Sequence, residues 1–537
     1  MRDADVPYGM IRSLLFGVPF AVFAGTLLQA ESAMPPAPNT RPLPADSIGP
    51  ALQRLADSLV AARPRLPGLL IAVESKRHGQ TWAVAAGMAD MARKTPLRPE
   101  QPVRIASNTK TYVAAAVLRL VEQGRLSLRD PLARHLPPAL DTLLRRDGYD
   151  TDIITIEQVL SHRAGFNEHP AVPSYAARLR TQPRYQWTRE EQITWLVDSL
   201  APVGPPGAQF RYSDSGYTLL GAIVERLTGK ALGPAVRELV GFDRLGLRQT
   251  WWETMEPVPA GVADRAHQYL GGTDAYGIDP SFDLYGGGGI VASMGDVARF
   301  LTALLDGRVL AQRATLDTML APRSPEMTGY GLGIFGTTAR GLGGRGHSGF
   351  WGTSAMAFPD AGVTIAVAVT EQAESRLLNV VMGEVLRLFG AGTAGTAATP
   401  PSATPPAQST AARDSADALA TFRENIDAIH KRDKARYLAT YVHTERLVRH
   451  SPTALETGYA NWPAITDNAW PDTLIVKEVR VAPIAPGVVY GYYRYIGVPT
   501  PGDTLTGVST RVFVRTPEGM RITVTASWND AVPPATR

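Results

Sequence analysis

The chain has 537 residues, of which 44% are hydrophobic and 19% are charged, and its mean hydropathy of -0.08 excludes both a multi-span transporter and a fully disordered chain. Its 54 Lys and Arg residues give a net charge of only +4 against 50 Asp and Glu residues, which argues against a nucleic-acid partner. The absence of cysteine excludes thiolate nucleophiles, disulfides and cysteine-ligated metal sites.

The N-terminus carries an apolar run from Leu14 to Leu28 that ends near the small residue Ala30. About fifteen residues are short for a membrane span of ~20, but they suit a secretory signal peptide, which we predict over residues 1–30. The protein is therefore predicted to be periplasmic or secreted, and retention by an uncleaved N-terminal anchor is the alternative. The Pro-rich residues 31–47 are predicted to form a flexible lead-in.

Residues 48–390 show strand patterns at both ends and helix patterns between them. Helical spacing of apolar residues begins at Leu52, and strand patterns at 69–75 and 81–87 then flank a polar turn, as in a hairpin. A longer helix is predicted over 108–123. The pattern returns to strands and a last helix at 331–337, 351–358, 363–370 and 374–389. This order predicts an α+β fold, in which one antiparallel sheet with flanking helices is closed by both ends of the segment and a helical subdomain is inserted.

Beyond this domain, residues 391–414 are rich in Ala, Thr and Pro and contain almost no large apolar side chain. Such a composition cannot bury a core and predicts a flexible linker. After it, helical spacing from Leu419 to Ile429 and strand alternation from Met520 to Trp528 predict a second, small α+β domain over residues 415–537.

Ser107 and Lys110 lie three residues apart, where an extended segment passes into the predicted longer helix. On the first helical turn the two side chains share one face, so the amine can reach the hydroxyl, and the helix N-terminus would stabilise a developing oxyanion. The pair indicates an activated serine nucleophile. An N-cap serine beside a surface lysine gives the same pattern and is the alternative for this motif taken alone.

A second motif, Tyr212-Ser213-Asp214, lies between a Pro/Gly-rich loop and an apolar helix pattern. A phenol at such a junction can relay a proton if neighbouring cations lower its pKa. A helix N-cap beside a half-buried tyrosine is the alternative.

A third motif, His347-Ser348-Gly349, comes just before the strand predicted at 351–358. Glycine at the head of a strand lets a ligand approach the backbone, and the N–H groups that follow can bind an oxyanion. An ordinary turn is the alternative for this motif alone.

The three motifs in this order resemble those of the serine β-lactamase and penicillin-binding-protein superfamily, and within it the group of class C β-lactamases, D-Ala-D-Ala carboxypeptidases and esterases. The stretches 156–166 and 287–293 are also similar to that group. The resemblance covers residues 48–390 and implies a β-lactamase/transpeptidase-like fold. Residues 415–537 resemble, more loosely, the NTF2-like (SnoaL-like) cone domains in their order of a helix followed by a curved sheet.

The resemblance implies that Ser107 is the acylated nucleophile and that Lys110 and Tyr212 form the general-base pair. The backbone N–H groups of Ser107 and Phe350 would make the oxyanion hole. No metal and no cofactor are needed for this chemistry. The substrate would be contacted by Asp214, His347, Ser348 and Gly349.

Two positions depart from the group's pattern. Asp214 stands where the group often has Asn, and its negative charge should favour a protonated Lys110 and leave more of the base role to Tyr212. His347 stands where β-lactamases have Lys, and a histidine is largely neutral at pH 7. Capture of a β-lactam carboxylate is therefore less secure than in a β-lactamase.

We therefore predict an exported serine hydrolase, carboxypeptidase-like or esterase-like, that cleaves an ester, amide or peptide bond through an acyl-enzyme on Ser107. A true class C-like β-lactamase is the alternative among enzymes. A non-catalytic penicillin-binding-type sensor or scaffold is the alternative of another class, although a binding module has no need of the intact set of Ser107, Lys110 and Tyr212. The predicted partner is a small-molecule or peptide acyl substrate, and the C-terminal domain could cap the cleft or form a homodimer.

Overall fold

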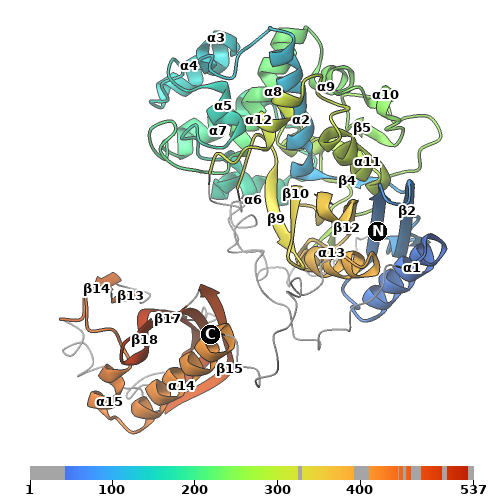
Figure 1. Cartoon of the computed structure of the whole chain (residues 1–537). Coiled ribbons are helices and arrows are strands. Elements are labelled where there is room, and N and C mark those ends of the chain that lie inside the picture. Colours follow the sequence, from blue (N-terminus) through green and yellow to red (C-terminus); the bar gives the residue numbers. More distant parts are fainter. Residues whose placement is uncertain are drawn as a thin grey trace, which may run out of the picture. The chain divides into compact units, whose positions relative to one another are not determined.

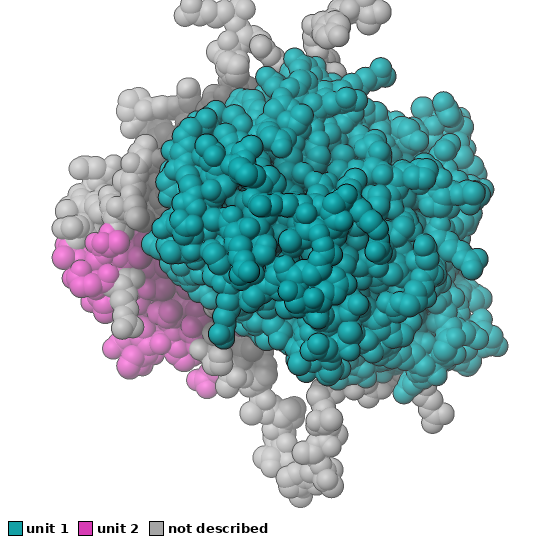
Figure 2. Space-filling model, turned by 90° about the horizontal axis from the view of Figure 1, so that it is seen from above, with its two compact units in different colours: residues 1–397 teal, residues 398–537 magenta. Residues whose placement is uncertain are grey.

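The computed structural model describes residues 43–324, 329–391, 410–445, 447–450, 455–460, 473–485, 487–498 and 505–529. The chain forms two compact units, Met1–Ala397 and Ala398–Arg537, which Figure 2 shows in different colours. The predicted signal peptide lies outside the described residues. Within them, no helix has both the length and the apolar composition that a membrane span requires.

The first unit is built on a seven-stranded antiparallel sheet with the order β3-β2-β1-β12-β11-β10-β9. Inside it, β1 (Gly68–Ser75) pairs with both β2 (Gln80–Asp90) and β12 (Val363–Val369). The predicted hairpin and the closure of the sheet by both ends of the segment are therefore confirmed. The remaining strands are β3 (Thr95–Pro96), β9 (Phe335–Ala339), β10 (Leu342–Gly349) and β11 (Thr353–Phe358).

Helices cover both faces of this sheet (Figure 1). On β1, Leu69 and Ile71 belong to the core shared with α1 (Ala45–Ala61) and α13 (Leu377–Leu388), whereas Leu70 belongs to the core of the helical part. The two sets alternate because successive side chains of a strand point to opposite faces. Each of these three side chains is at most 1% exposed, and burial of each contributes ~1.5–3 kcal/mol to stability.

The helical part lies between β4 and β9 in the sequence. Its helices are α2 (Thr109–Glu122), α3 (Leu132–His135), α4 (Pro138–Arg146), α5 (Ile156–Leu160), α6 (Pro173–Thr181), α7 (Arg189–Ser199), α8 (Asp214–Thr228), α9 (Leu232–Val240), α10 (Phe242–Leu245), α11 (Met294–Leu305) and α12 (Arg313–Leu320). Two small sheets accompany them, one of β4 (Val103–Arg104), β8 (Ile290–Ala292) and β5 (Thr250–Trp252), the other of β6 (Tyr269–Leu270) and β7 (Thr273–Asp274).

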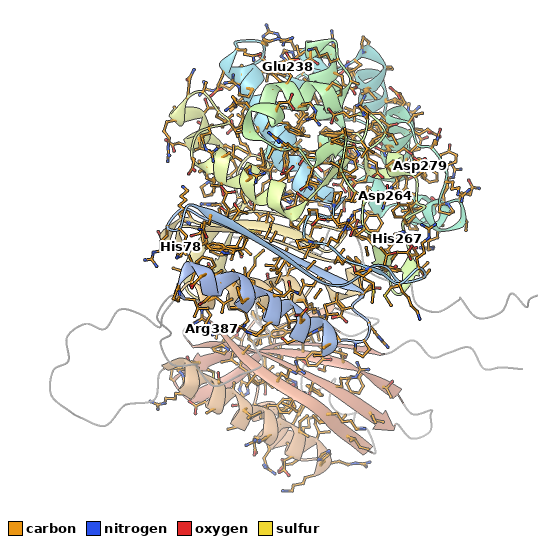
Figure 3. The ribbon with its side chains drawn as sticks, turned by 90° about the vertical axis from the view of Figure 1, so that its right-hand side faces the viewer. His78, Glu238, Asp264, His267, Asp279 and Arg387 are labelled. Carbon is orange, nitrogen blue, oxygen red and sulfur yellow. The ribbon has the colours of Figure 1, made fainter. Side chains whose placement is uncertain are left out.

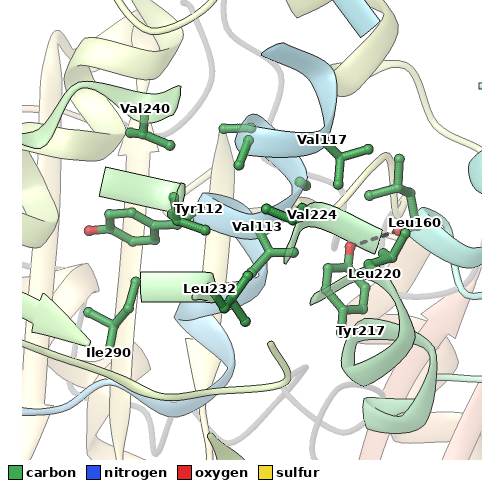
Figure 4. Packing of buried hydrophobic residues seen from close by; sticks show 14 of the residues in the cluster. Tyr112, Val113, Val117, Leu160, Tyr217, Leu220, Val224, Leu232, Val240 and Ile290 are labelled. Carbon is green, nitrogen blue, oxygen red and sulfur yellow. Dashed lines mark hydrogen bonds between the residues drawn. The ribbon is translucent and has the colours of Figure 1, made fainter. Parts of the chain in front are cut away.

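Helices α2 and α8 pack together in the centre of this part. Val113 and Val117 of α2 lie in one cluster with Leu220 and Val224 of α8 (Figure 4), and all four are fully buried. The first motif lies at the start of α2 and the second at the start of α8, so the packing of these two helices determines how the two motifs meet. The third motif lies on the sheet, in β10.

Two predictions for the last strands of the first unit were wrong. The strand expected at 331–337 begins only at Phe335, and β10 was not predicted, so that His347 lies within a strand and not in a turn before one. The sequence of β10 is rich in glycine, which is unfavourable in isolated strands. Here glycine is required by close packing, because a Cβ on Gly346 would lie 1.9 Å from the Ala355 carbonyl oxygen of β11.

The second unit packs a long helix against a six-stranded sheet with the order β14-β13-β18-β17-β16-β15. All its strand pairs are antiparallel except β13 with β18. Its core joins Phe422 and Ile426 of the helix to Val489 and Phe513 of the sheet. The elements are α14 (Thr410–His430), α15 (Lys434–Ala439), β13 (Val448–His450), β14 (Leu455–Thr457), β15 (Thr473–Ala485), β16 (Val488–Val498), β17 (Leu505–Thr516) and β18 (Gly519–Asn529).

The ends of the predicted lead-in and linker also belong to the fold. Helix α1 already starts at Ala45, and α14 starts at Thr410, inside the predicted linker. The Asp414 carboxylate accepts hydrogen bonds from Arg515 Nε and from the Gly487 N–H, both at 2.8 Å. These partners are distant in the sequence, so composition alone could not reveal them. The other linker residues after Ala391 lie outside the described residues.

Candidate active site

Ser107 lies in a short 3-10 turn, Ala106–Asn108, that leads directly into α2. Ala106 has φ +45, which costs energy for a residue with a side chain. The turn is held against β11, because Asn108 Nδ2 donates to the Ile105 carbonyl at 2.9 Å and to Thr353 Oγ1 at 3.0 Å. The serine hydroxyl is therefore fixed at the base of α2.

Lys110 is fully buried and projects from the first turn of α2 toward Ser107. Its ammonium donates to Ser107 Oγ at 2.9 Å, to Asp214 Oδ1 at 2.5 Å and to the Gly287 carbonyl oxygen at 2.7 Å. An ammonium has three donors, so all three are used. The surface-lysine alternative is therefore wrong.

Asp214 is held in place by the cap of α8. The Ser213 side chain accepts from the Gly216 N–H at 3.2 Å and donates to the Asn167 carbonyl at 2.6 Å, so the N-cap interpretation of this motif also applies. The structure places the Asp214 carboxylate on Lys110, where it acts on the lysine and not on an open substrate site.

The charge of Asp214 determines the protonation of the lysine. Burial by itself would lower the pKa of Lys110, but the Asp214 carboxylate outweighs this effect and holds that pKa above its ordinary value. Lys110 is therefore an ammonium at neutral pH.

Tyr212 completes the group around Ser107. The Lys110 Nζ atom lies 5.0 Å from the centre of its ring, and the side chains of Lys110 and Ser107 both act to lower the pKa of its hydroxyl. Burial raises the pKa of Tyr212, and Asp214 adds to this, so the lowering by Lys110 is outweighed. The condition that neighbouring cations lower this pKa is not met, and Tyr212 is a phenol at rest.

A chain of neutral groups lies on the other side of Tyr212. The Ser213 N–H donates to His162 Nδ1 at 3.1 Å, which leaves the proton of His162 on Nε2, 3.1 Å from the Tyr330 hydroxyl. His347 Nδ1 must donate to the Ser348 carbonyl at 2.7 Å, so its Nε2 accepts from Tyr330 at 3.2 Å. The hydrogen bonds thus run in one direction, from His162 through Tyr330 to His347.

Both histidines of this chain are buried and neutral. Burial, with the nearby charge of Lys110, lowers the pKa of His162 far below its usual value and that of His347 to about 3. His347 is only 3% exposed and uses both ring nitrogens within the protein. The structure therefore gives it no free nitrogen to face a substrate.

The end of β10 lies directly on the turn that carries Ser107. A Cβ on Gly349 would stand 2.3 Å from the Ile105 carbonyl oxygen, so only glycine allows this approach. Phe350 follows Gly349, and its backbone N–H and that of Ser107 thus belong to adjoining segments. The oxyanion hole made by these two groups remains a prediction that this arrangement permits.

Two acidic residues near Lys110 were missed from the sequence. Burial raises the pKa of Glu168 to about 8 and that of Asp283 to about 7, and in both cases the Asp214 charge adds to the effect. Neither residue belongs to one of the three motifs. The nearest sequence signals are the stretch 156–166, which ends shortly before Glu168, and the stretch 287–293, which follows Asp283. Among the described residues no group of three or more His, Asp or Glu side chains is arranged to hold a metal ion.

The sequence match to known proteins agrees with this geometry. A family model described as Beta-lactamase matches residues 53–380, more than half of the chain. The chain belongs to the beta-lactamase family.

Curated relatives match only parts of the chain. Esterase EstB from Burkholderia gladioli is 34% identical over 227 residues, which are 41% of this chain and 55% of that protein. The mitochondrial serine beta-lactamase-like protein LACTB of Homo sapiens is 25% identical over 346 residues, 52% of this chain and 61% of that protein. The chain spans about half the length of the curated relatives it matches.

Similar solved structures confirm the predicted α+β fold of the first unit. A D-stereospecific amidohydrolase from Streptomyces sp. has a TM-score of 0.52 at 25% identity, covering 61% of this chain and 97% of that one. An octameric penicillin-binding protein homologue from Pyrococcus abyssi has a TM-score of 0.52 at 16% identity, covering 88% of this chain and 99% of that one. At that identity the second likeness concerns the fold alone.

Proposed function

We propose that the chain is a serine hydrolase that cleaves an ester or amide bond through an acyl-enzyme on Ser107. The observation that carries this proposal is the contact of the Lys110 ammonium with Ser107 Oγ at 2.9 Å, beside Tyr212, whose ring centre lies 5.0 Å from Lys110 Nζ. Nucleophile and proton-transfer groups within hydrogen-bonding reach are what covalent catalysis by serine requires. The names of EstB and of the amidohydrolase describe ester and amide hydrolysis in relatives, which supports the same class.

The resting protonation states determine how the reaction begins. Lys110 is an ammonium and Tyr212 a phenol, so this pair must lose one proton before it can accept the proton of Ser107. In that form Ser107 Oγ bonds to the substrate carbonyl carbon while its proton passes to the pair. The bond from that carbon to the leaving group then breaks as the pair protonates the leaving group. Water repeats the same steps on the acyl-enzyme and releases the acid. The rate is therefore expected to rise with pH.

Short-chain esters are expected to be better substrates than β-lactams. His347 is neutral and buried, so it offers no cation for the carboxylate that penicillins and cephalosporins carry. Among the described residues of the third motif no other cationic side chain replaces it.

Hydrolysis of a p-nitrophenyl ester series and of a chromogenic cephalosporin by the purified protein tests the proposal, with Ser107→Ala as the background control. We expect kcat/KM for the best ester to exceed that for the cephalosporin by at least about tenfold, the effect of losing one charge-assisted contact. A faster cephalosporin would indicate a true β-lactamase. Absence of turnover with every substrate, without labelling of Ser107, would indicate the non-catalytic sensor or scaffold.

We further propose that the protein is exported and that its second unit is an NTF2-like accessory domain. The packing of α14 across the long antiparallel strands β15 to β18 supports the second of these proposals. None of the three motifs lies beyond Gly349, so a chain that ends at Phe389 is expected to keep most of its activity on small esters. Loss of that activity in a truncated protein that is still folded would mean that the second unit completes the active site.

A further inference from the structure

Glu168 is a buried carboxyl group near Lys110 that the mechanism does not use. The residue is 0% exposed, and neither of its side-chain oxygens has a hydrogen-bond partner among the described residues. A carboxyl group removed from water without such partners is costly as an anion. Its retention at this position therefore calls for a role that a neutral acid can fill.

The chain holds Glu168 opposite Asp214. The two residues that flank Glu168 are hydrogen-bonded to the two residues that flank Asp214. These two hydrogen bonds run from Ser213 Oγ to the Asn167 carbonyl oxygen at 2.6 Å and from the His169 N–H to Ser215 Oγ at 3.0 Å. Among the charges that shift the pKa of Glu168, that of Asp214 has the largest effect, which agrees with this placement.

The Asp214 carboxylate has one oxygen left for a further donor. Its Oδ1 accepts from the Lys110 ammonium at 2.5 Å, whereas no described residue donates to its Oδ2. An ionised carboxylate only accepts hydrogen bonds, so Glu168 and Asp214 cannot bond to each other while both are ionised. If one of them is protonated, its O–H group is a donor for the other.

Glu168 is the one of the two that holds a proton. Asp214 has an ammonium as its partner, whereas Glu168 has no partner of its own. Burial, to which the charge of Asp214 adds, raises the pKa of Glu168 to about 8. At neutral pH Glu168 is therefore a neutral acid with an O–H group to donate.

The other ionisable groups around Glu168 do not take its place beside Asp214. The positive charges of Lys110 and Arg211 lower the pKa of Glu168, but neither group donates to it. All three donors of Lys110 are used elsewhere, and Arg211 Nη2 donates to Asn167 Oδ1 at 3.3 Å. Burial lowers the pKa of His169, the next residue in the chain, to about 4, so it is neutral.

We propose that Glu168 is a positioning residue, which as a neutral acid donates a hydrogen bond to Asp214 Oδ2 and so holds that carboxylate against Lys110. Because Glu168 is fully buried, it acts on Ser107 through these two residues and does not contact the substrate. This inference rests on the proposed hydrolase function and adds a residue to its mechanism.

Ionisation of Glu168 should limit the reaction at high pH. It removes the hydrogen bond to Asp214 and places a second negative charge near Lys110. That charge opposes the loss of a proton from the pair of Lys110 and Tyr212, on which the reaction depends. Above the pKa of Glu168 this effect offsets the gain from a higher pH. For the intact protein kcat/KM should therefore rise with pH and level off near pH 8.

The plot of kcat/KM against pH for one p-nitrophenyl ester, from pH 6 to pH 9.5, provides the test. Glu168→Gln keeps an N–H donor for Asp214 and cannot ionise. It should match the intact protein at pH 7, continue to rise above pH 8 and exceed the intact protein by at least about tenfold at pH 9.5. Glu168→Ala keeps no donor, so its kcat/KM should be about tenfold lower at pH 7 and should also rise without levelling off.

Two further variants serve as controls. Glu238→Gln makes the same chemical change at an exposed residue of α9 (labelled in Figure 3) and should leave the profile unchanged. Asp283→Asn removes another carboxyl group whose pKa the charge of Asp214 raises, and its profile should still level off near pH 8.

Three results would overturn the inference without affecting the proposed function. These are an intact protein whose profile rises to pH 9.5 without levelling off, a Glu168→Gln profile that levels off as in the intact protein, and a levelling that is lost only in Asp283→Asn. Absence of ester hydrolysis by the intact protein, without labelling of Ser107, would instead contradict the proposed function itself.

Discussion

Two buried groups of side chains flank Tyr212, and the pKa values of their basic residues are shifted in opposite directions. On one side Lys110 is held as a cation, with a pKa above its ordinary value. On the other side His162 and His347 are held neutral, with pKa values far below theirs. All three side chains are nearly or fully buried, so burial alone cannot explain the contrast.

The contrast depends on the partner that each group meets. Lys110 contacts a carboxylate at 2.5 Å, whereas the ring nitrogens of His162 and His347 form hydrogen bonds, among the described residues, only with a phenol, a backbone N–H and a backbone carbonyl. Removal from water penalises the charged form in every case, and only an opposite charge reverses that penalty. The protein thus keeps one positive charge beside Ser107 and uses uncharged groups to hold the neighbouring strand.

Replacement of Lys110 or of Tyr212 beside it should have the largest effect on activity. Lys110→Ala and Tyr212→Phe are each expected to lower kcat about a hundredfold or more, as expected for loss of general acid–base help. Because both groups move the same proton, the double variant should be little worse than either single variant. Steady-state kinetics with one p-nitrophenyl ester measures this, and losses that multiply in the double variant would show that the two residues act independently.

The neutral side should make the protein sensitive to acid. A further buried histidine, His169, lies in the turn His169–Ala171, and its Nδ1 is hydrogen-bonded with Ser215 Oγ at 3.0 Å. His347 and His169 have folded pKa values of about 3 and about 4 against an ordinary value of 6.5, so below pH 6.5 the unfolded chain binds protons that the folded chain does not. The stabilisation is therefore fully present above pH 6.5 and is lost as the pH falls, by about 2 kcal/mol for each histidine at pH 5. Over the same range the raised pKa values of Glu168 and Asp283 stabilise the folded protein as the pH falls. The histidine contribution is therefore measured as a difference between variants in urea unfolding at pH 7 and pH 5.

A matched variant isolates the contribution of one histidine. Replacement of His169 by Asn removes one titrating group, so the loss of unfolding free energy between pH 7 and pH 5 should be smaller in this variant by about 2 kcal/mol. A change of unfolding free energy between pH 7 and pH 5 that is the same in His169→Asn and in the intact protein would contradict the neutral, buried state of His169.

Neutralising Asp214 should lower the pKa of Lys110 and so make the charged side of Tyr212 more like the neutral side. The Asp214 charge raises the pKa of both Lys110 and Tyr212, so Asp214→Asn should allow the pair to lose its proton at lower pH. The rising limb of the plot of kcat/KM against pH should then move down by about one pH unit or more. Asp264→Asn, an exposed position labelled in Figure 3, is the control and should leave the limb in place. A limb that moves up would mean that Asp214 does not set the protonation of this pair.

The sequence predicted those parts of the site that depend on local geometry. Ser107 and Lys110 share a face because they lie three residues apart on a helical turn, and their contact follows from that spacing. The hairpin of β1 and β2 was likewise predicted from its alternating pattern and its polar turn. Each of these features is determined by residues that are close together in the chain.

The rest of the site depends on contacts between distant segments. Lys110 and the Gly287 carbonyl are 177 residues apart, and His162 and Tyr330 are 168 residues apart. No periodicity connects such positions, so neither the neutral chain through Tyr330 nor the place of Asp283 beside Gly287 could be predicted. Strand β10 was missed for a related reason, since the need for glycine in it arises only where β11 packs against it.

The most direct test of the acyl-enzyme mechanism is mass spectrometry of the protein after reaction with a fluorophosphonate probe. Intact mass should rise by one adduct, and peptide mapping should place that adduct on Ser107, whose hydroxyl is the nucleophile held against Lys110. Ser107→Ala should remain unlabelled while its unfolding midpoint stays near that of the intact protein. A stoichiometric adduct on another serine, or an intact protein that is never labelled although it hydrolyses esters, would contradict the assignment of Ser107 as the nucleophile.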